Sequence, residues 1–203
     1  MSSNQITDTR AANRWKKLRH AYEYATAHIA SKKGNIYAIN RIDLVLISNF
    51  KGGNASIAEP MNQIDVKLIE YSAELSSIGK EFNKVKLQEL EESELSKLCN
   101  FASRFLNLTL TERTRIDGFG PSYASALLNI YFPDLLPILD RRVLLAAGAP
   151  SIKLNSQKQV YNIEKHYPWL INYSYDQLKE NKKLTMSQMD YELFSTKIPE
   201  NLR

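Results

Sequence analysis

The sequence predicts an all-α fold for this chain of 203 residues. Apolar residues recur every three or four positions in segment after segment, which is the period of an amphipathic helix. The sequence contains no sustained alternation of apolar and polar residues, which would indicate strands. Because 43% of the residues are apolar, the chain can bury a core, and it is too short for several independent domains. We therefore expect one compact helical unit over residues 1–203, which could be divided into two lobes.

The first helices are predicted from apolar spacing and from capping residues. Residues 13–30 form the first, because apolar side chains recur there at helical spacing with cations between them. Asp43 can cap a short apolar helix over residues 44–47. The loop 48–54 follows, and its paired glycines indicate a tight turn.

Helical spacing returns further along the chain. It covers residues 64–75 and then residues 93–105, where Ser93 is a candidate N-cap. The acidic stretch 89–94 is predicted to be a solvated link. Four further helices are predicted over residues 124–131, after Asp140, over residues 160–166 and over residues 186–194.

Positive charge is concentrated near the N-terminus. The chain carries 27 Lys and Arg against 22 Asp and Glu, a net charge of +5. Residues 1–51 hold nine of these cations and three acids, which leaves +6 in this segment alone. Such a segment suits a surface that faces phosphates, since neutralising phosphates releases counterions. A solvated basic helix face is the alternative interpretation.

Composition excludes several kinds of site. The single Cys99 rules out an internal disulfide and a four-cysteine zinc or iron-sulfur site, and it lies in an apolar stretch typical of a buried thiol. His20, His28 and His166 share no metal-ligand spacing, so we expect no metal site. No apolar run approaches the length of a membrane span, and the polar start lacks the apolar core of a secretion signal. We expect a cytoplasmic protein with no membrane partner.

Residues 113–128 carry the most informative local pattern. Gly118 and Gly120 surround one apolar residue immediately before a predicted helix, and Pro121 suits the first helical position, where no N–H is needed. Both glycines can take positive φ and let a phosphate approach the main chain, while free N–H groups of the helix start point at it. Such a hairpin grips a phosphate without reading sequence. The alternative is an ordinary glycine turn between packed helices.

The continuation of this segment carries a family resemblance. Residues 133–143 read Pro-Asp-Leu-Leu-Pro-Ile-Leu-Asp-Arg-Arg-Val, and Asp140 follows Gly120 by 20 residues. Together with the hairpin, this pattern resembles the helix-hairpin-helix, Gly/Pro-rich, Asp (HhH-GPD) superfamily of DNA glycosylases. Pro137-Ile-Leu-Asp140 is similar to the matching segment of adenine-mismatch glycosylases, whose Asp is catalytic. The resemblance covers residues 113–147.

The resemblance implies a fold, a partner and a set of contacts. It implies the two-lobed HhH-GPD fold, with flanking helices in residues 13–110 and 155–195 completing the lobes. It also implies a monomer that binds double-stranded DNA, with no iron-sulfur cluster, although such hairpins can hold a structural monovalent cation. Arg141 and Arg142 could meet a phosphate or pair with Asp134 or Asp140. The hairpin residues implied to contact DNA are Gly118, Phe119, Gly120, Ser122 and Tyr123.

A second, weaker resemblance lies upstream. Residues 46–57 resemble the apolar helix and Asn-rich loop of 8-oxoguanine glycosylases, a loop that enters the minor groove. This resemblance implies that Phe50, Lys51 and Asn54 wedge into the DNA or contact the orphaned base. A polar surface loop is an equal alternative, given the Gly-Asn-Ser composition.

Asp140 is the candidate catalytic residue. Breaking an N-glycosidic bond builds positive charge on the deoxyribose, which a carboxylate stabilises. Asp140 is also a good N-cap for the helix that follows, and the two roles are compatible. Members of the superfamily that cleave the strand carry a lysine at the position of Ser122, and a hydroxyl cannot form a Schiff base. We therefore expect a monofunctional enzyme, and we do not expect Lys51 or Lys153 to reach the pocket as a substitute.

The predicted function is a DNA glycosylase that removes a damaged, mispaired or modified base. The alternative is a non-catalytic helix-hairpin-helix module that binds DNA, in which Asp140 is only a cap. The two differ in whether Asp140 faces a base-sized pocket beside the hairpin, with a second polar group there. A base pocket needs stacking walls, and its candidates are aromatic side chains that are more often core. They are Trp15, Tyr24, Phe50, Tyr123, Trp169 and Tyr173.

Overall fold

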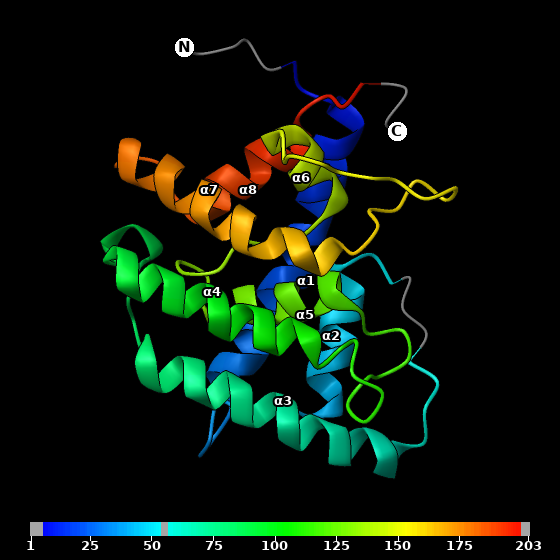
Figure 1. Cartoon of the computed structure of the whole chain (residues 1–203). Helices are drawn as coiled ribbons and strands as arrows, with labels where there is room; N and C mark the ends of the chain where they lie inside the picture. The colour runs from blue at the N-terminus through cyan, green and yellow to red at the C-terminus, as the bar shows by residue number, and fades with distance from the viewer. Residues whose placement is uncertain (1–5, 54–56, 200–203) are drawn as a thin grey trace.

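The computed structural model describes residues 6–53 and 57–199, and this part of the chain is all-helical (Figure 1). In place of strands these residues form only three isolated β-bridges. The prediction of an all-α fold is confirmed. The α-helices are α1 (Thr9–Ser31), α2 (Arg41–Phe50), α3 (Met61–Glu81), α4 (Glu92–Asn107), α5 (Pro121–Tyr131), α6 (Arg141–Ala147), α7 (Tyr167–Glu180) and α8 (Met186–Ser195). Two short 3₁₀ helices, η1 (Leu87–Glu89) and η2 (Ile163–His166), complete them.

Helix α5 lies at the centre of the fold. Its residues 124–130 are all buried, and it contacts α1, α2 and α4. A helix that is buried around its whole circumference must be enclosed by other elements, and α5 is such a helix. In Figure 1, α3 and α4 lie on one side of α5, while α6, α7 and α8 gather on the other with the start of α1. Helix α1 packs against α2, α5 and α8.

One predicted helix is misplaced. Residues 160–166 were expected to form an α-helix. The structure has a turn at residues 161–162 and the 3₁₀ helix η2 over residues 163–166. The α-helix begins at Tyr167 and continues to Glu180 as α7, which the apolar spacing did not predict. Pro168 in its first turn is the missed signal, since proline has no N–H to leave unpaired at that position.

Two predicted N-caps are also wrong. Helix α4 begins at Glu92, so Ser93 lies inside its first turn. The acidic stretch 89–94 accordingly belongs partly to helices and not to a solvated link. Helix α2 begins at Arg41 and is capped by Asn40, whose side chain accepts from the N–H groups of Ile42 and Asp43. Asp43 is instead the third helical residue and accepts from the Asn40 N–H at 2.7 Å, which completes a capping box.

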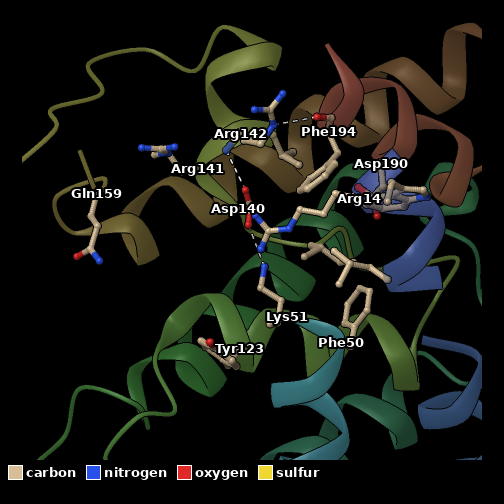
Figure 2. Close-up of a pocket in the computed structure, with 14 residues that line it drawn as sticks. Arg14, Phe50, Lys51, Tyr123, Asp140, Arg141, Arg142, Gln159, Asp190 and Phe194 are labelled. Carbon is tan, nitrogen blue, oxygen red and sulfur yellow. Dashed lines mark hydrogen bonds and ion pairs between the residues drawn. The ribbon is translucent and has the colours of Figure 1, made fainter. Parts of the chain in front are cut away.

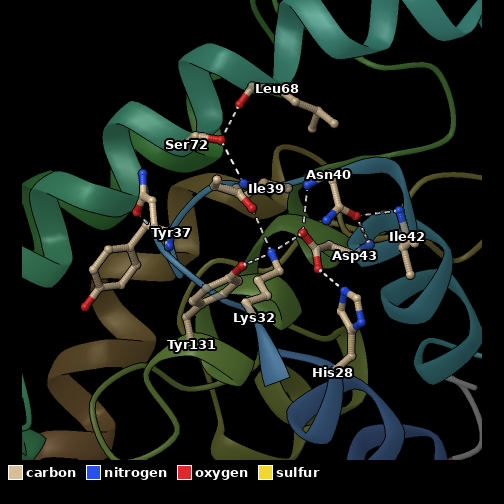
Figure 3. A network of polar contacts seen from close by, with 12 residues as sticks. His28, Lys32, Tyr37, Ile39, Asn40, Ile42, Asp43, Leu68, Ser72 and Tyr131 are labelled. Atoms are coloured by element: carbon tan, nitrogen blue, oxygen red, sulfur yellow. Dashed lines mark hydrogen bonds and ion pairs between the residues drawn. The ribbon is translucent and has the colours of Figure 1, made fainter. Parts of the chain in front are cut away.

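Asp43 is the centre of a buried polar network that joins α1, α2 and α5 (Figure 3). One carboxylate oxygen accepts from the Lys32 Nζ at 2.6 Å, and the other lies 3.1 Å from His28 Nε2. Lys32 also donates to the Tyr131 hydroxyl at 2.8 Å and to the Ala38 carbonyl. Because the Asp43 side chain is fully buried, its charge must be paired in this way. The network holds α2 in place, and α2 carries Lys51 at its end.

No α-helix in the described residues is both long and apolar enough to span a bilayer.

Candidate active site

The glycine hairpin closes as a β-turn directly before α5. The Phe119 N–H donates to the Ile116 carbonyl at 3.0 Å, and Gly118 has a φ of 82°. A turn with positive φ at its third residue favours glycine there. Gly120 does not share this conformation. Its φ is −88° and its ψ is −176°, so the expectation of positive φ holds for Gly118 alone.

Gly120 forms the open N-terminus of α5. Pro121 follows as the first helical residue, as predicted. A Cβ added at Gly120 would meet no atom within 4 Å, so the space in front of this helix end is empty. Among the described residues, the N–H groups of Gly120 and Ser122 have no recorded acceptor. This end of α5 therefore offers unpaired donors and a partial positive charge to an anion.

Two serines of α5 hold the segment that leads to Asp140. The Ser122 hydroxyl donates to the Leu139 carbonyl at 2.7 Å. The Leu139 N–H in turn donates to the Ser125 Oγ at 2.9 Å. Ser122, which was predicted to contact DNA, thus fixes the residue before Asp140. Asp140 follows Gly120 by 20 residues. These two hydrogen bonds nevertheless hold the residue before Asp140 against the start of α5.

Asp140 caps α6 and also faces a cavity. Its Oδ1 accepts from the Arg142 N–H at 2.9 Å, which is the capping role predicted for it. Its Oδ2 lies 3.0 Å from the Nζ of Lys51. The side chain of Asp140 is 25% exposed and that of Lys51 is 12% exposed. The expectation that no other lysine would reach the pocket is therefore wrong for Lys51.

Lys51 is placed by the end of α2. It is the C-cap residue, and its N–H donates to the Ile47 carbonyl at 2.9 Å. Gly52 and Gly53 follow with φ values of 98° and 70°, which only glycine adopts without strain. The Gly53 N–H donates back to the Ser48 carbonyl at 2.8 Å. This closed turn stops the helix and directs the lysine inward.

The charges around Asp140 keep its carboxylate ionised. Burial alone would raise the pKa of Asp140. The positive charge of Lys51, the Arg142 N–H and the charge of Arg141 outweigh burial, and they lower the pKa below its ordinary value. Asp140 is therefore a full negative charge at neutral pH.

Asp140 and Lys51 line a cavity of about 370 Å³ (Figure 2). This volume falls within the range of roughly 300–1,000 Å³ that small-ligand pockets occupy. The lining comes from α1, α2, α5, α6 and α8 and from the segments that connect them. Its aromatic side chains are Trp15, Phe50, Tyr123 and Phe194. Trp15 and Phe194 pack together with their ring centroids 5.2 Å apart.

A second carboxyl group faces the same cavity. Asp190 of α8 is buried, and its Oδ1 has no hydrogen-bond partner among the described residues. The Ile138 N–H donates to its carboxyl group. Burial raises the pKa of Asp190 to about 8, and the nearby negative charge of Asp140 adds to the shift. Asp190 is therefore mostly protonated at neutral pH, so it offers a donor as well as an acceptor.

Asp190 also borders a second cavity, of about 470 Å³, which shares Trp15, Phe50 and Ile138 with the first. Sequence reasoning missed Asp190. The available signal was an acid on the apolar face of α8, where Met186 and Leu193 are also buried. An unpaired carboxyl group at such a position is costly and needs an explanation.

Several predicted DNA contacts lie elsewhere than expected. The Phe119 side chain is in the core against Tyr71, so only its main chain remains for a contact. Phe50 is buried and packs edge-on against Tyr22, so it forms a cavity wall and not an exposed wedge. Tyr123 is half-buried at the cavity. Asn54 lies outside the described residues.

The two arginines after Asp140 differ from each other. Arg142 pairs with Asp8 at 3.1 Å and donates to the carbonyls of Phe194 and Thr196, so it ties α6 to both ends of the chain. Its side chain pairs with neither Asp134 nor Asp140, and its Nε and Nη2 are engaged by these other partners. Arg141 donates to the Lys158 carbonyl at 2.6 Å and lies at the cavity mouth.

Within residues 6–53 and 57–199, no cluster of three or more His, Cys, Asp or Glu side chains is arranged to hold a metal ion. Comparison with known proteins gives no match for this chain among protein-family models, curated proteins or solved structures.

Proposed function

We propose that this chain is a DNA glycosylase with a two-lobed HhH-GPD-like fold, acting as a monomer on double-stranded DNA. One observation carries the proposal. An ionised Asp140 and a second polar group, Asp190, face one base-sized cavity beside the open N-terminus of α5. This juxtaposition favours an enzyme over a module that only binds DNA. A carboxylate that served only as a cap would need no cavity in front of it.

The cavity supports the chemistry of base release. A base must leave the duplex to reach a buried carboxylate, and its flat faces then need apolar walls. Trp15, Phe50 and Phe194 supply such walls. As the bond between C1′ and the base breaks, its electron pair leaves with the base, and positive charge develops on the sugar. The carboxylate of Asp140 stabilises that charge. Water then adds at C1′, and a proton passes to the departing base, which leaves an abasic site. Asp190 offers a hydrogen-bonding edge to the extracted base.

Positive side chains of α1 surround the approach to the cavity. Arg14 lines the cavity itself and extends toward Asp140 (Figure 2). Arg10, Arg14 and Lys17 also line a neighbouring surface depression, and all three are exposed. A basic helix beside the cavity mouth and the open end of α5 would together hold the phosphates on either side of a flipped nucleotide.

Removing two of these cations should reduce the salt dependence of DNA binding. We expect the double variant Arg10→Gln, Lys17→Gln to lower the slope of log K against log salt by about 2, because each phosphate contact contributes about 0.9. Duplex binding measured by fluorescence anisotropy at several salt concentrations gives this slope. The variant Lys80→Gln, Lys84→Gln, which removes two exposed cations at the end of α3 and just beyond it, is the matched control and should leave the slope nearly unchanged. Equal slopes for both variants would exclude α1 as the phosphate-binding face.

Filling the space at the start of α5 should weaken DNA binding with little effect on folding. The backbone of Gly120 is allowed for alanine, and the added methyl group meets no protein atom. We expect Gly120→Ala to cost less than about 1 kcal/mol of stability, because alanine is a poorer N-cap than glycine. DNA affinity should fall about 3- to 10-fold, because the methyl group occupies the path of the phosphate. Unchanged affinity alongside an unchanged Tm would mean that no phosphate approaches this helix end.

The activity is tested by single-turnover base release on a panel of duplexes. The panel carries 8-oxoguanine, its mispair with adenine, uracil, alkylated purines and modified cytosines. We expect free base from at least one of these duplexes, and the panel would then identify the substrate. Release from none of them would contradict the proposed activity for this range of bases.

A further inference from the structure

We propose that Lys51 is a nucleophile that attacks the deoxyribose C1′, so that the enzyme also cleaves DNA at abasic sites through a Schiff base. This inference rests on the proposed function, because it needs the sugar to lie against Asp140. The amine comes from the end of α2, whereas the hairpin position expected to carry it holds Ser122.

The amine of Lys51 lies beside the catalytic carboxylate proposed for this site. The Nζ of Lys51 lies 3.0 Å from the Asp140 carboxylate, and both groups line the same cavity. A carboxylate that stabilises a cation on the sugar must itself lie within a few ångströms of C1′. An amine in direct contact with that carboxylate is therefore also within reach of C1′. No other lysine lines this cavity among the described residues.

The Lys51 side chain is held so that its amine faces the cavity. Its side chain is 12% exposed, so it is largely shielded from water but open to the cavity. In the described residues its Nζ has Asp140 as its one recorded partner. Its backbone is held by the closed glycine turn at the end of α2, and that helix is fixed by the buried Asp43 network. A lysine presented from a rigid element loses little entropy when it reaches a bound sugar.

Ser122 is not an alternative nucleophile. Its hydroxyl donates to the Leu139 carbonyl at 2.7 Å. Asp140 is engaged by the Arg142 N–H and by Lys51. Lys51 is thus the group in the cavity with a nitrogen that can form a covalent bond to carbon.

The reaction balances without an oxidant or reductant. Lys51, after losing a proton to water, adds its nitrogen electron pair to C1′ of the abasic aldehyde. The carbinolamine oxygen takes up a proton and leaves as water, which gives an iminium ion. A C2′ proton passes to a carboxylate or water, and the C3′–O bond breaks with its electron pair leaving on the 3′ phosphate. Water then adds at C1′, releasing Lys51 and an unsaturated aldehyde on the cleaved strand.

The test is covalent trapping by borohydride on a duplex that already contains an abasic site. Hydride reduces the iminium ion to a stable amine, which links protein to DNA. We expect trapping by wild type and a loss of about 10²-fold or more in Lys51→Arg and Lys51→Gln. Arginine keeps the charge beside Asp140 but stays protonated and cannot form the imine. Lys153→Gln removes an exposed lysine and is the matched control, expected to trap like wild type. Mass spectrometry should find the adduct on Lys51.

The outcomes separate this inference from the proposed function, because a preformed abasic site needs no base release. Trapping by Lys51→Arg at the wild-type rate, or an adduct on another residue, would overturn the role of Lys51. If wild type releases a base but is not trapped on the abasic duplex, the role of Lys51 is also overturned. The glycosylase would then be monofunctional. Trapping on Lys51 without release of any base from the panel would support this inference while the proposed glycosylase activity failed.

Discussion

Asp140→Asn should abolish base release while leaving DNA binding intact. The change removes the negative charge that stabilises the sugar cation and keeps the size of the side chain. We expect the single-turnover rate to fall by about 10²–10³-fold or more, the loss typical of removing one group that stabilises transition-state charge. Asparagine caps helices as well as aspartate does, so its Oδ1 can still accept from the Arg142 N–H and α6 should persist.

Two controls make this result interpretable. Asp134→Asn neutralises an exposed acid at the neighbouring cavity and should release base at the wild-type rate. Anisotropy titrations should show that Asp140→Asn binds the duplex at least as tightly as wild type, because it loses a negative charge near the phosphates. Base release by Asp140→Asn within a few-fold of wild type would reduce Asp140 to a helix cap.

Asp190→Asn should stabilise the protein, and the gain should grow with pH. Unfolded aspartate has a pKa of about 3.9, whereas burial raises the pKa of folded Asp190 to about 8. Between these values the folded state holds a proton that the unfolded state has released. Stability therefore falls as pH rises through this window, and the penalty is complete above about pH 8. Asparagine has no proton to lose and escapes this penalty.

We expect denaturant melts to give equal stabilities at pH 4 and a gain on the order of 3–5 kcal/mol for Asp190→Asn at pH 8 to 9. Asp176→Asn, which removes an exposed acid from α7, is the matched control and should show a difference that does not change with pH. A pH-independent difference for Asp190→Asn as well would mean that Asp190 is ionised throughout. It would then offer no donor to a base.

The hairpin and Asp140 could be predicted because their signals are local. Glycine on both sides of one apolar residue, followed by proline, specifies a turn and a helix start within a few positions, and the structure has both. Helix spans were predictable for the same reason where apolar spacing was regular, as in α1 and α3. Helix α7 was not, because the spacing indicated a helix over residues 160–166 that ends where α7 begins. Its proline marks the true first turn.

The rest of the site depends on contacts between distant parts of the chain. Lys51 and Asp140 are brought together by the packing of α2 beside α5, which no local pattern records. The resemblance to the loop of 8-oxoguanine glycosylases implied that Phe50 wedges into the DNA, yet its ring is buried against Tyr22. Asp190 gave only the weak signal of an acid among apolar residues. The positions of Lys51, Phe50 and Asp190 depend on burial and on contacts between residues that are far apart in the sequence.

The measurement that tests the central claim most directly is single-turnover release of free base from the duplex panel, by wild type and Asp140→Asn side by side. If Asp140 is catalytic, wild type frees a base from at least one duplex, and Asp140→Asn binds the same duplex without freeing it. If neither protein releases any base, although both bind DNA with a steep salt dependence, the chain is a non-catalytic helix-hairpin-helix module and the account is contradicted.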